Sequence, residues 1–243
     1  MLEKCEGIVL RAIKCANGTT ILDIYSSSMG RAQFSSGRRE RSRRGGTGVL
    51  CMPLSVVSME YEYRPKDSIQ RLKEWKLDYA PAELPFHPLK GAIALFVAEL
   101  LTRVLHEQEA NRGLYDYLRQ SIVTLDRCSK GIANYHLVFM MQLACYLGIF
   151  PNLTHYEEGI GFHLQEAEFL PLPLTPNAYH LHPDEAKALH ELVRMNYQNM
   201  GLFAMNRLQR NRCLSLMLEY YQLHLPGMGS LKSVEVLQQL FAD

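Results

Sequence analysis

Hydrophobic and polar residues alternate in short runs along the first 80 residues, a pattern typical of β-strands. The runs are rich in β-branched and aromatic residues and cover residues 6–13, 19–25, 31–35, 49–63 and 68–77. Turn-forming residues such as Asn17, Gly18, Gly30 and Pro65 separate them. Five strands with no helix between them predict a small barrel of the OB type. The fourth run is unusually long, and we expect it to bend around Pro53 so that one strand serves both sides of the barrel.

The pattern changes near residue 80, where Pro81, Pro85 and Pro88 fall within eight residues. Beyond them apolar residues recur at helical spacing and predict helices over residues 89–109, 114–125, 132–147, 182–197, 206–223 and 233–241. The spacing is lost over residues 149–182, which predicts an irregular or two-stranded insertion. The chain is therefore expected to be an α+β protein. An OB-fold barrel domain would cover residues 1–80, and a mainly helical bundle domain with the insertion would cover residues 81–243.

Composition supports a folded protein without a membrane or export segment. Of the 243 residues, 47% are apolar and 21% charged, which is too apolar for a disordered chain. No stretch approaches the roughly 20 uncharged apolar residues that a membrane helix needs. The six cysteines form no CxxC pair, so free thiols are expected. We expect a cytoplasmic protein with no membrane partner.

Charge is distributed unevenly along the chain. Residues 1–80 hold 14 Lys and Arg against 9 Asp and Glu, an excess of five positive charges. The remaining residues hold 12 against 16, an excess of four negative charges. This asymmetry favours a polyanionic partner for the first domain only.

The basic excess is concentrated in a loop rich in arginine and glycine. Arginine pairs bidentately with phosphate, and glycine permits a close approach of the backbone. A solvated surface loop is the alternative interpretation. Further basic residues follow in the turn before the fifth strand and along that strand. The predicted nucleic-acid-binding residues are Arg31, Arg38, Arg39, Arg41, Arg43, Arg44, Lys66, Arg71, Lys73 and Lys76.

Four aromatic residues of the predicted barrel offer surfaces on which bases could stack: Phe34, Tyr61, Tyr63 and Trp75. The alternative for each is a place in the barrel core, where most aromatic residues of small barrels lie.

The sequence contains no motif of a catalytic or metal site. It lacks a phosphate-binding GxxxxGK loop, an HExxH helix and a GxSxG elbow. Four histidines, His155, His163, His180 and His182, raise a zinc hypothesis, but no cysteine lies in the insertion to complete a tetrahedral site. We therefore expect no catalytic residue, no metal and no cofactor.

Six short segments resemble the RecO family in their order and spacing. Four lie in the predicted barrel, at residues 6–11 (EGIVLR), 21–25 (ILDIY), 29–31 (MGR) and 37–39 (GRR). Two lie in the helical part, at residues 98–105 (AELLTRVL) and 146–152 (YLGIFPN). Many members carry a four-cysteine zinc site in the insertion, which this sequence lacks.

The resemblance implies a bacterial recombinational repair mediator that is not an enzyme and associates with the nucleoid. Such a protein would bind single- and double-stranded DNA and anneal complementary strands. With RecR it would help RecA replace single-strand-binding protein (SSB) on DNA. The SSB tail is acidic and ends in an aromatic residue, so its receptor is expected to be an apolar groove rimmed by cations. The candidate cations are Arg103, Arg112, Arg119, Arg127 and Lys130, and ordinary solvated helix charges are the alternative.

Two other functions stay open from the residues alone. An OB-fold protein that binds RNA would show the same charge and stacking residues. A protein adaptor that docks its arginine loop on an acidic partner would bind without nucleic acid.

Overall fold

The computed structural model describes residues 1–36, 51–106, 108–171 and 179–240. The chain divides into two compact units. The first contains residues 1–127 and 231–237, and the second contains residues 128–230 and 238–243.

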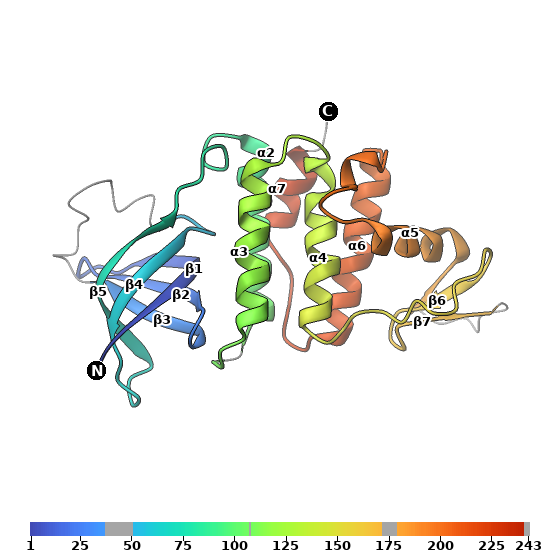
Figure 1. Ribbon diagram of the computed structural model, residues 1–243. Helices are drawn as coiled ribbons and strands as arrows, with labels where there is room; N and C mark the ends of the chain where they lie inside the picture. The colour runs from blue at the N-terminus through green and yellow to red at the C-terminus, as the bar shows by residue number, and fades with distance from the viewer. Residues whose placement is uncertain (37–50, 107, 172–178, 241–243) are drawn as a thin grey trace. The chain divides into compact units, whose positions relative to one another are not determined.

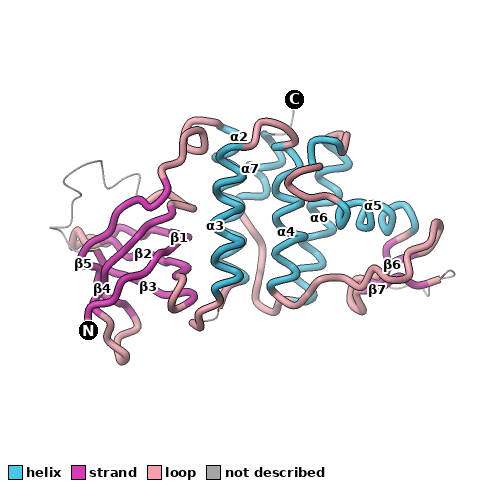
Figure 2. Tube along the Cα trace, in the orientation of Figure 1, coloured by secondary structure: helices cyan, strands magenta, loops and turns pink. Residues whose placement is uncertain are grey.

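A five-stranded barrel opens the first unit (Figures 1 and 2). Antiparallel pairs join β1 to β2, β2 to β3, β4 to β5 and β1 to β4, and one parallel pair joins β3 to β5. These pairs form a closed ring in the order β1-β2-β3-β5-β4. With the helices that follow, they confirm the predicted α+β class. The strands are β1 (Leu2–Lys14), β2 (Thr20–Ser26), β3 (Gly30–Ser36), β4 (Val56–Glu62) and β5 (Ile69–Tyr79).

The strand that serves both sides of the barrel is β1, so the prediction that the fourth run does so was wrong. β1 pairs with β4 through residues 2–8 and with β2 through residues 7–14, with an irregularity between Val9 and Arg11. In the described part of the fourth run, residues 51–63, the strand begins at Val56, because Pro53 lies in a turn and Leu54 has a left-handed φ of 64°.

Gly7 lies where β1 is shared between its two neighbours. A Cβ atom at this position would lie 2.5 Å from Cγ2 of Ile24 and 3.0 Å from Cε of Met59. Both of those side chains belong to the barrel core. The crossing of β1 is therefore tight enough to require glycine.

Two helices of the same unit, α2 (Pro88–Val104) and α3 (Arg112–Arg127), follow the barrel (Figure 1). α2 begins with Pro88 and with the ring of His87, whose Nδ1 accepts the backbone N–H of Lys90 at 3.5 Å. It ends at Val104, five residues before the end of the predicted helix. The last helix, α7 (Ser233–Leu240), begins beside α2, where the Glu99 carboxylate accepts the N–H groups of Lys232 and Ser233.

A buried carboxylate holds the segment between the barrel and α2. Asp126, 2% exposed, accepts the Tyr79 hydroxyl at 2.6 Å and the backbone N–H of Leu84 at 2.7 Å. It also accepts the backbone N–H groups of Ala82 and Glu83. Burial alone would raise the pKa of Asp126, but these hydrogen bonds outweigh it and hold the pKa below its usual value.

The contacts of Asp126 form a clamp on the segment between the barrel and α2, and the fully buried Lys90 of α2 adds to it. Its Nζ donates to the backbone carbonyl of Asp126 at 2.6 Å and to the Glu83 carboxylate at 2.7 Å. The segment after residue 80 is thus fixed to α2 and α3. This explains why the compact units divide at residue 127, whereas the sequence pattern placed a boundary at residue 80.

The second unit is mainly helical (Figure 1). Within it, the Tyr221 hydroxyl donates to the Met140 carbonyl at 2.5 Å, which joins α6 to α4. The Asn134 amide donates to the carbonyls of Met200 and Phe203, each at 3.0 Å. The described helical elements are η1 (Ile132–Asn134), α4 (Tyr135–Tyr146), α5 (Pro183–Arg194), η2 (Met200–Leu202) and α6 (Arg207–His224).

The predicted insertion contains a small sheet. Its strands β6 (Gly161–His163), β7 (Glu168–Leu170) and β8 (His180–Leu181) lie in the order β7-β6-β8. Phe162 and Phe169 pack edge to face at 5.0 Å, and His190 of α5 packs edge to face with Phe169 at 6.3 Å. Aromatic packing therefore joins this sheet to the helices.

Candidate nucleic-acid interface

The register of β3 and β5 fixes where the arginine loop begins. β3 ends at Ser36, and its neighbour Ser35 pairs with Arg71 of β5. Arg71 is exposed and makes no ion pair with any described residue. The loop residues Arg38, Arg39, Arg41, Arg43 and Arg44 lie outside the described residues. The chain thus enters its most basic segment directly beside an exposed arginine.

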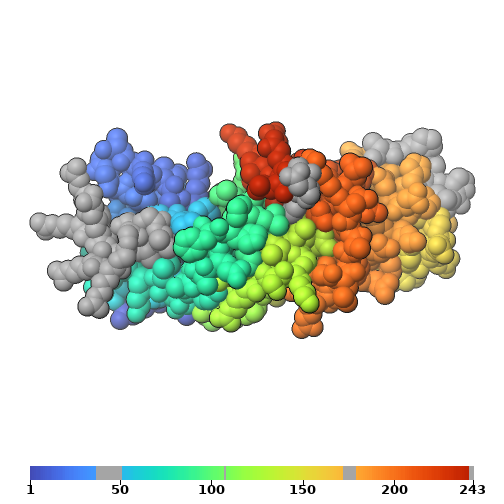
Figure 3. Space-filling model, turned by 90° about the horizontal axis from the view of Figure 1, so that it is seen from above, coloured from blue at the N-terminus to red at the C-terminus, as the bar shows by residue number. Residues whose placement is uncertain are grey.

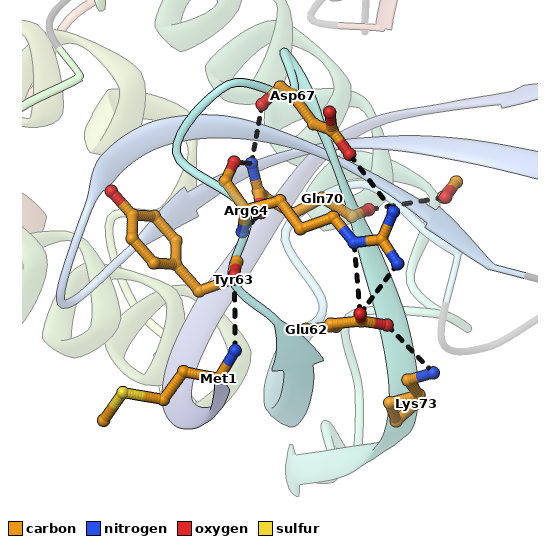
Figure 4. A network of polar contacts seen from close by, with 8 residues as sticks. Met1, Glu62, Tyr63, Arg64, Asp67, Gln70 and Lys73 are labelled. Atoms are coloured by element: carbon orange, nitrogen blue, oxygen red, sulfur yellow. Dashed lines mark hydrogen bonds and ion pairs between the residues drawn. The ribbon is translucent and has the colours of Figure 1, made fainter.

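Three of the cations predicted from β5 and its preceding turn differ in their surroundings. Lys66 and Lys76 are exposed. Lys73 lies 3.1 Å from the Glu62 carboxylate, which Arg64 also binds at 2.7 Å (Figure 4). Hydrogen bonds from Arg64 and then from Lys73 lower the pKa of Glu62 to about 2, so this carboxylate is ionised and neutralises part of the basic face.

Figure 4 shows the rest of this network around the turn between β4 and β5. Arg64 reaches Asp67 at 3.7 Å, and the Gln70 side chain binds the backbone of Arg64 and Asp67. The two carboxylates balance the charges of Arg64 and Lys73. Arg71 and Lys76 are therefore the β5 cations without an ion pair to a described residue.

Arg31 serves the fold, which corrects its prediction as a phosphate contact. Its guanidinium makes a bidentate pair with Asp23 at 2.6 and 2.9 Å. Its Nη1 also donates to the carbonyls of Thr102 and Leu105 at the end of α2, both at 2.7 Å. These contacts join the barrel to α2 and occupy the donors that a phosphate would need.

Three of the four predicted stacking residues, Phe34, Tyr61 and Trp75, belong to the barrel core, and for Phe34 and Tyr61 full burial makes the assignment as stacking surfaces wrong. Phe34 and Tyr61 are both 0% exposed and pack edge to face at 5.3 Å. The Tyr61 hydroxyl donates to Glu3 at 2.8 Å, and burial raises its pKa above the usual value. The β-strand alternation turns both rings inward, where the barrel interior needs large side chains.

Tyr63 is half-buried, whereas Trp75 is a buried core residue at the edge of a cleft. Trp75 is 9% exposed and borders a cleft of about 600 Å³ formed by β1, β4, β5 and the start of α3. Its indole N–H has no hydrogen-bond partner among the described residues. No local sequence pattern indicated this cleft, because only cross-strand pairing aligns Cys5, Met59 and Trp75.

The five cations predicted for the SSB tail are spread over several elements. Arg103 is exposed near the end of α2, and Lys130 belongs to the second unit. Arg112 pairs with Asp116 at 3.0 Å, and Arg119 pairs with Asp78 of β5 at 2.9 Å. Arg127, whose guanidinium lies 5.9 Å from the Tyr79 ring, is about 22 Å from Arg112 at the helical rise of α3.

Neither a metal cluster nor a membrane helix is found in the described part of the chain. No three His, Cys, Asp or Glu side chains there are grouped to hold a metal ion. His163 and His180 contact each other at 4.5 Å, and Nδ1 of His163 accepts the Glu166 N–H. All six cysteines are free, which confirms that expectation. None of the described helices is long and apolar enough to span a bilayer.

Two family models match consecutive parts of the chain. The N-terminal model of recombination protein O matches residues 1–79, and its C-terminal model matches residues 86–235. The gap between the two models falls at the proline-rich segment, where the sequence pattern changes.

Relatives that match this chain over its full length are named DNA repair protein RecO. The chain is 42% identical to the DNA repair protein RecO of Bacteroides fragilis over 99% of this chain and 100% of the relative. It is also 42% identical to RecO of Phocaeicola vulgatus over the whole of both chains. RecO of Azobacteroides pseudotrichonymphae is 32% identical over 99% of this chain and 100% of the relative. From the two family models and these relatives, the chain belongs to the RecO family of DNA repair proteins.

Proposed function

We propose that this chain is a recombination mediator whose barrel binds single- and double-stranded DNA and anneals complementary strands. The observation that carries the proposal is the position of exposed Arg71 beside the entry to the arginine loop. Arg38, Arg39, Arg41, Arg43 and Arg44 would extend the phosphate-binding surface from Arg71, with Lys66 and Lys76 as further contacts.

Annealing in this proposal is electrostatic. Two DNA strands repel each other, and a cationic segment lowers this repulsion by neutralising phosphates on both. Each neutralised phosphate releases condensed counterions, so affinity should fall steeply with salt. The process needs no catalytic turnover.

The proposed partners are RecR, RecA-coated DNA as the product, and SSB on the starting DNA. The helical part would engage the acidic SSB tail while the barrel holds the strand. Among the predicted tail-binding cations, Arg103 is exposed, whereas Arg112 and Arg119 already have carboxylate partners. Arg103→Ala is therefore the first substitution to examine for tail affinity, and Arg119→Ala is its matched comparison.

The test measures DNA binding and annealing of fluorescent strands at several salt concentrations. Arg38→Ala/Arg39→Ala should reduce the slope of log affinity against log salt by up to about 2, one unit per lost phosphate contact. A matched control, Arg207→Ala/Lys232→Ala, removes two exposed cations outside the barrel and should keep the wild-type slope.

Three results would decide against the proposal. Equal effects of the two double variants would show that only net charge matters. Tighter binding to RNA than to a DNA strand of the same sequence would favour an RNA-binding protein. A wild-type chain that neither binds nor anneals DNA would favour the protein adaptor. Loading of RecA on SSB-coated DNA, with and without RecR, then tests the mediator step separately.

A further inference from the structure

A groove of about 830 Å³ lies within the second unit, between α5, residues 202–205 and the start of α6. Cys213 and Leu216 line it and are buried, each 2% exposed. Leu202 and Leu208 also line it, but they are 83% and 80% exposed. Two leucines this exposed beside one groove form an apolar surface that water covers poorly. Figure 3 shows that α5 and α6, coloured orange, reach the surface of this unit.

Five charged residues of α5 line the groove, and four of them follow a regular order. Asp184, Lys187, Glu191 and Arg194 are spaced three or four residues apart, so they form one stripe along the helix. Their signs alternate from negative at the first turn to positive at the last. The small side chain of Ala188 lies within the stripe and also lines the groove.

This order of charges is complementary to itself when it is read in the opposite direction. In an antiparallel pair of α5 helices centred near residue 189, Asp184 faces Arg194 of the second copy. Lys187 then faces Glu191 of the second copy, and the twofold axis repeats both pairs. Antiparallel packing also sets the positive end of each helix dipole beside the negative end of the other.

The remaining charges of the groove do not favour a strongly charged partner. Glu185 and Arg212 also line it, and they already form an ion pair with each other. With Asp184, Lys187, Glu191 and Arg194 they make three acidic and three basic residues. A neutral surface lets an identical surface approach without repulsion, whereas an acidic or basic ligand would gain no net attraction.

We propose that α5 packs antiparallel against α5 of a second copy of this chain, giving a twofold-symmetric dimer that covers Leu202 and Leu208. The contact is isologous, because the same patch supplies the charges and the leucines on both sides. Ala188 near the centre of the stripe allows the two helix backbones to approach closely. The dimer would present two barrels at once, one for each strand to be annealed.

The first measurement is sedimentation velocity of the full chain from low to high micromolar concentration. Wild type should show a reversible monomer to dimer transition. Leu202→Asp/Leu208→Asp should weaken the dimer by on the order of a hundredfold, because it places four carboxylates in the apolar centre of the interface. The matched control, Leu95→Asp, changes a leucine of α2 that is 51% exposed in the first unit and should dimerise as wild type does.

Charge exchange gives the sharper test. Lys187→Glu/Arg194→Glu makes the stripe wholly acidic, and Asp184→Lys/Glu191→Lys makes it wholly basic. Each variant alone should be monomeric, since like charges then face each other. An equimolar mixture should restore the dimer as a pair of one acidic and one basic chain.

Circular dichroism establishes that each variant is folded before it is compared. A wild-type chain that stays monomeric overturns the proposal, whether or not the groove takes up a peptide or another protein. Dimers that survive in both charge variants overturn it as well. So does a mixture of two folded variants that fails to recombine.

Discussion

The two compact units are held together by different means. In the first unit, five strands close a ring of backbone pairs, and buried charged groups such as Asp126 and Lys90 fix the helices that follow. In the second unit, neutral side chains such as Asn134 and Tyr221 bridge the helices through backbone carbonyls. Its α5 keeps its charged stripe at the surface, beside two exposed leucines.

This difference shows that a basic residue cannot be assigned a role from its type alone. Arg31 belongs to the same basic segment as the arginine loop, yet its donors are taken up by Asp23 and by α2. Arg71 lies on the neighbouring strand and is exposed without an ion pair to any described residue. The fold uses Arg31 for stability and leaves Arg71 at the surface, where the proposed DNA contact would need it.

The largest expected effect is the loss of the buried clamp in the first unit. Asp126→Ala leaves three backbone N–H groups and the Tyr79 hydroxyl without their acceptor, and should lower the free energy of unfolding by about 3 to 4 kcal/mol. Urea denaturation followed by fluorescence of Trp75, the single tryptophan, reports on the barrel. Asp78→Ala removes a partly exposed ion pair with Arg119 and should cost less than about 1 kcal/mol. Equal losses of stability in Asp126→Ala and Asp78→Ala would contradict the role of Asp126 as a clamp.

The same clamp should weaken in acid. The pKa of Asp126 is lower in the folded chain than in the unfolded chain, so its contribution to stability is complete above the unfolded value of about 4. This contribution is lost as the pH falls through the lower folded value. The difference in stability between wild type and Asp126→Asn should therefore shrink below about pH 4.

The second unit should lose stability at a higher pH than the clamp does. His136 of α4 is fully buried, and burial, followed by the charge of Arg210, lowers its pKa to about 3. The unfolded chain takes up this proton below about pH 6.5, so stability should fall by about 2 kcal/mol between about pH 6.5 and pH 5. Unfolding followed by helical circular dichroism measures this loss.

A histidine at the surface gives the control for that pH dependence. His136→Gln should remove the slope between about pH 6.5 and pH 5, whereas His155→Gln changes an exposed residue and should keep it. A slope that persists in folded His136→Gln would assign the proton uptake to another group.

The smallest expected effect on stability is that of Arg71→Ala, and comparison with Arg31→Ala distinguishes the roles of the two arginines. Arg31→Ala should lower the free energy of unfolding by about 2 kcal/mol, because Asp23 and two carbonyls lose their donor. The slope of DNA affinity against salt should not change once the variant is folded. Arg71→Ala should leave stability within about 0.5 kcal/mol and reduce that slope by about 1. If Arg71→Ala lowered the stability and Arg31→Ala reduced the salt slope, Arg71 would be the stabilising residue and Arg31 the DNA contact.

Local sequence pattern predicted most of the elements and the class of fold. Alternation of apolar residues indicated the barrel strands, and helical spacing indicated α2 to α7, because these patterns record which face of each element is buried. The proline-rich segment marked the change of pattern that also separates the two family models. The excess of positive charge in the first 80 residues could be counted directly.

Contacts between residues far apart in the sequence could not be predicted from local pattern. The contact of Arg31 with Leu105, the convergence of four donors on Asp126 and the sharing of β1 by two neighbours all join segments far apart in the chain. Burial of Phe34 and Tyr61 depends on which face of each strand turns toward the barrel interior.

The sequence by itself determined the elements, the uneven charge and the resemblance to RecO, since each of these depends on residue type and spacing. Only the tertiary structure decided which charges are used for folding and which remain at the surface. The physical reason is that desolvation and hydrogen bonding depend on neighbours in space, and a chain that folds into a barrel and helices brings together residues that no local pattern relates.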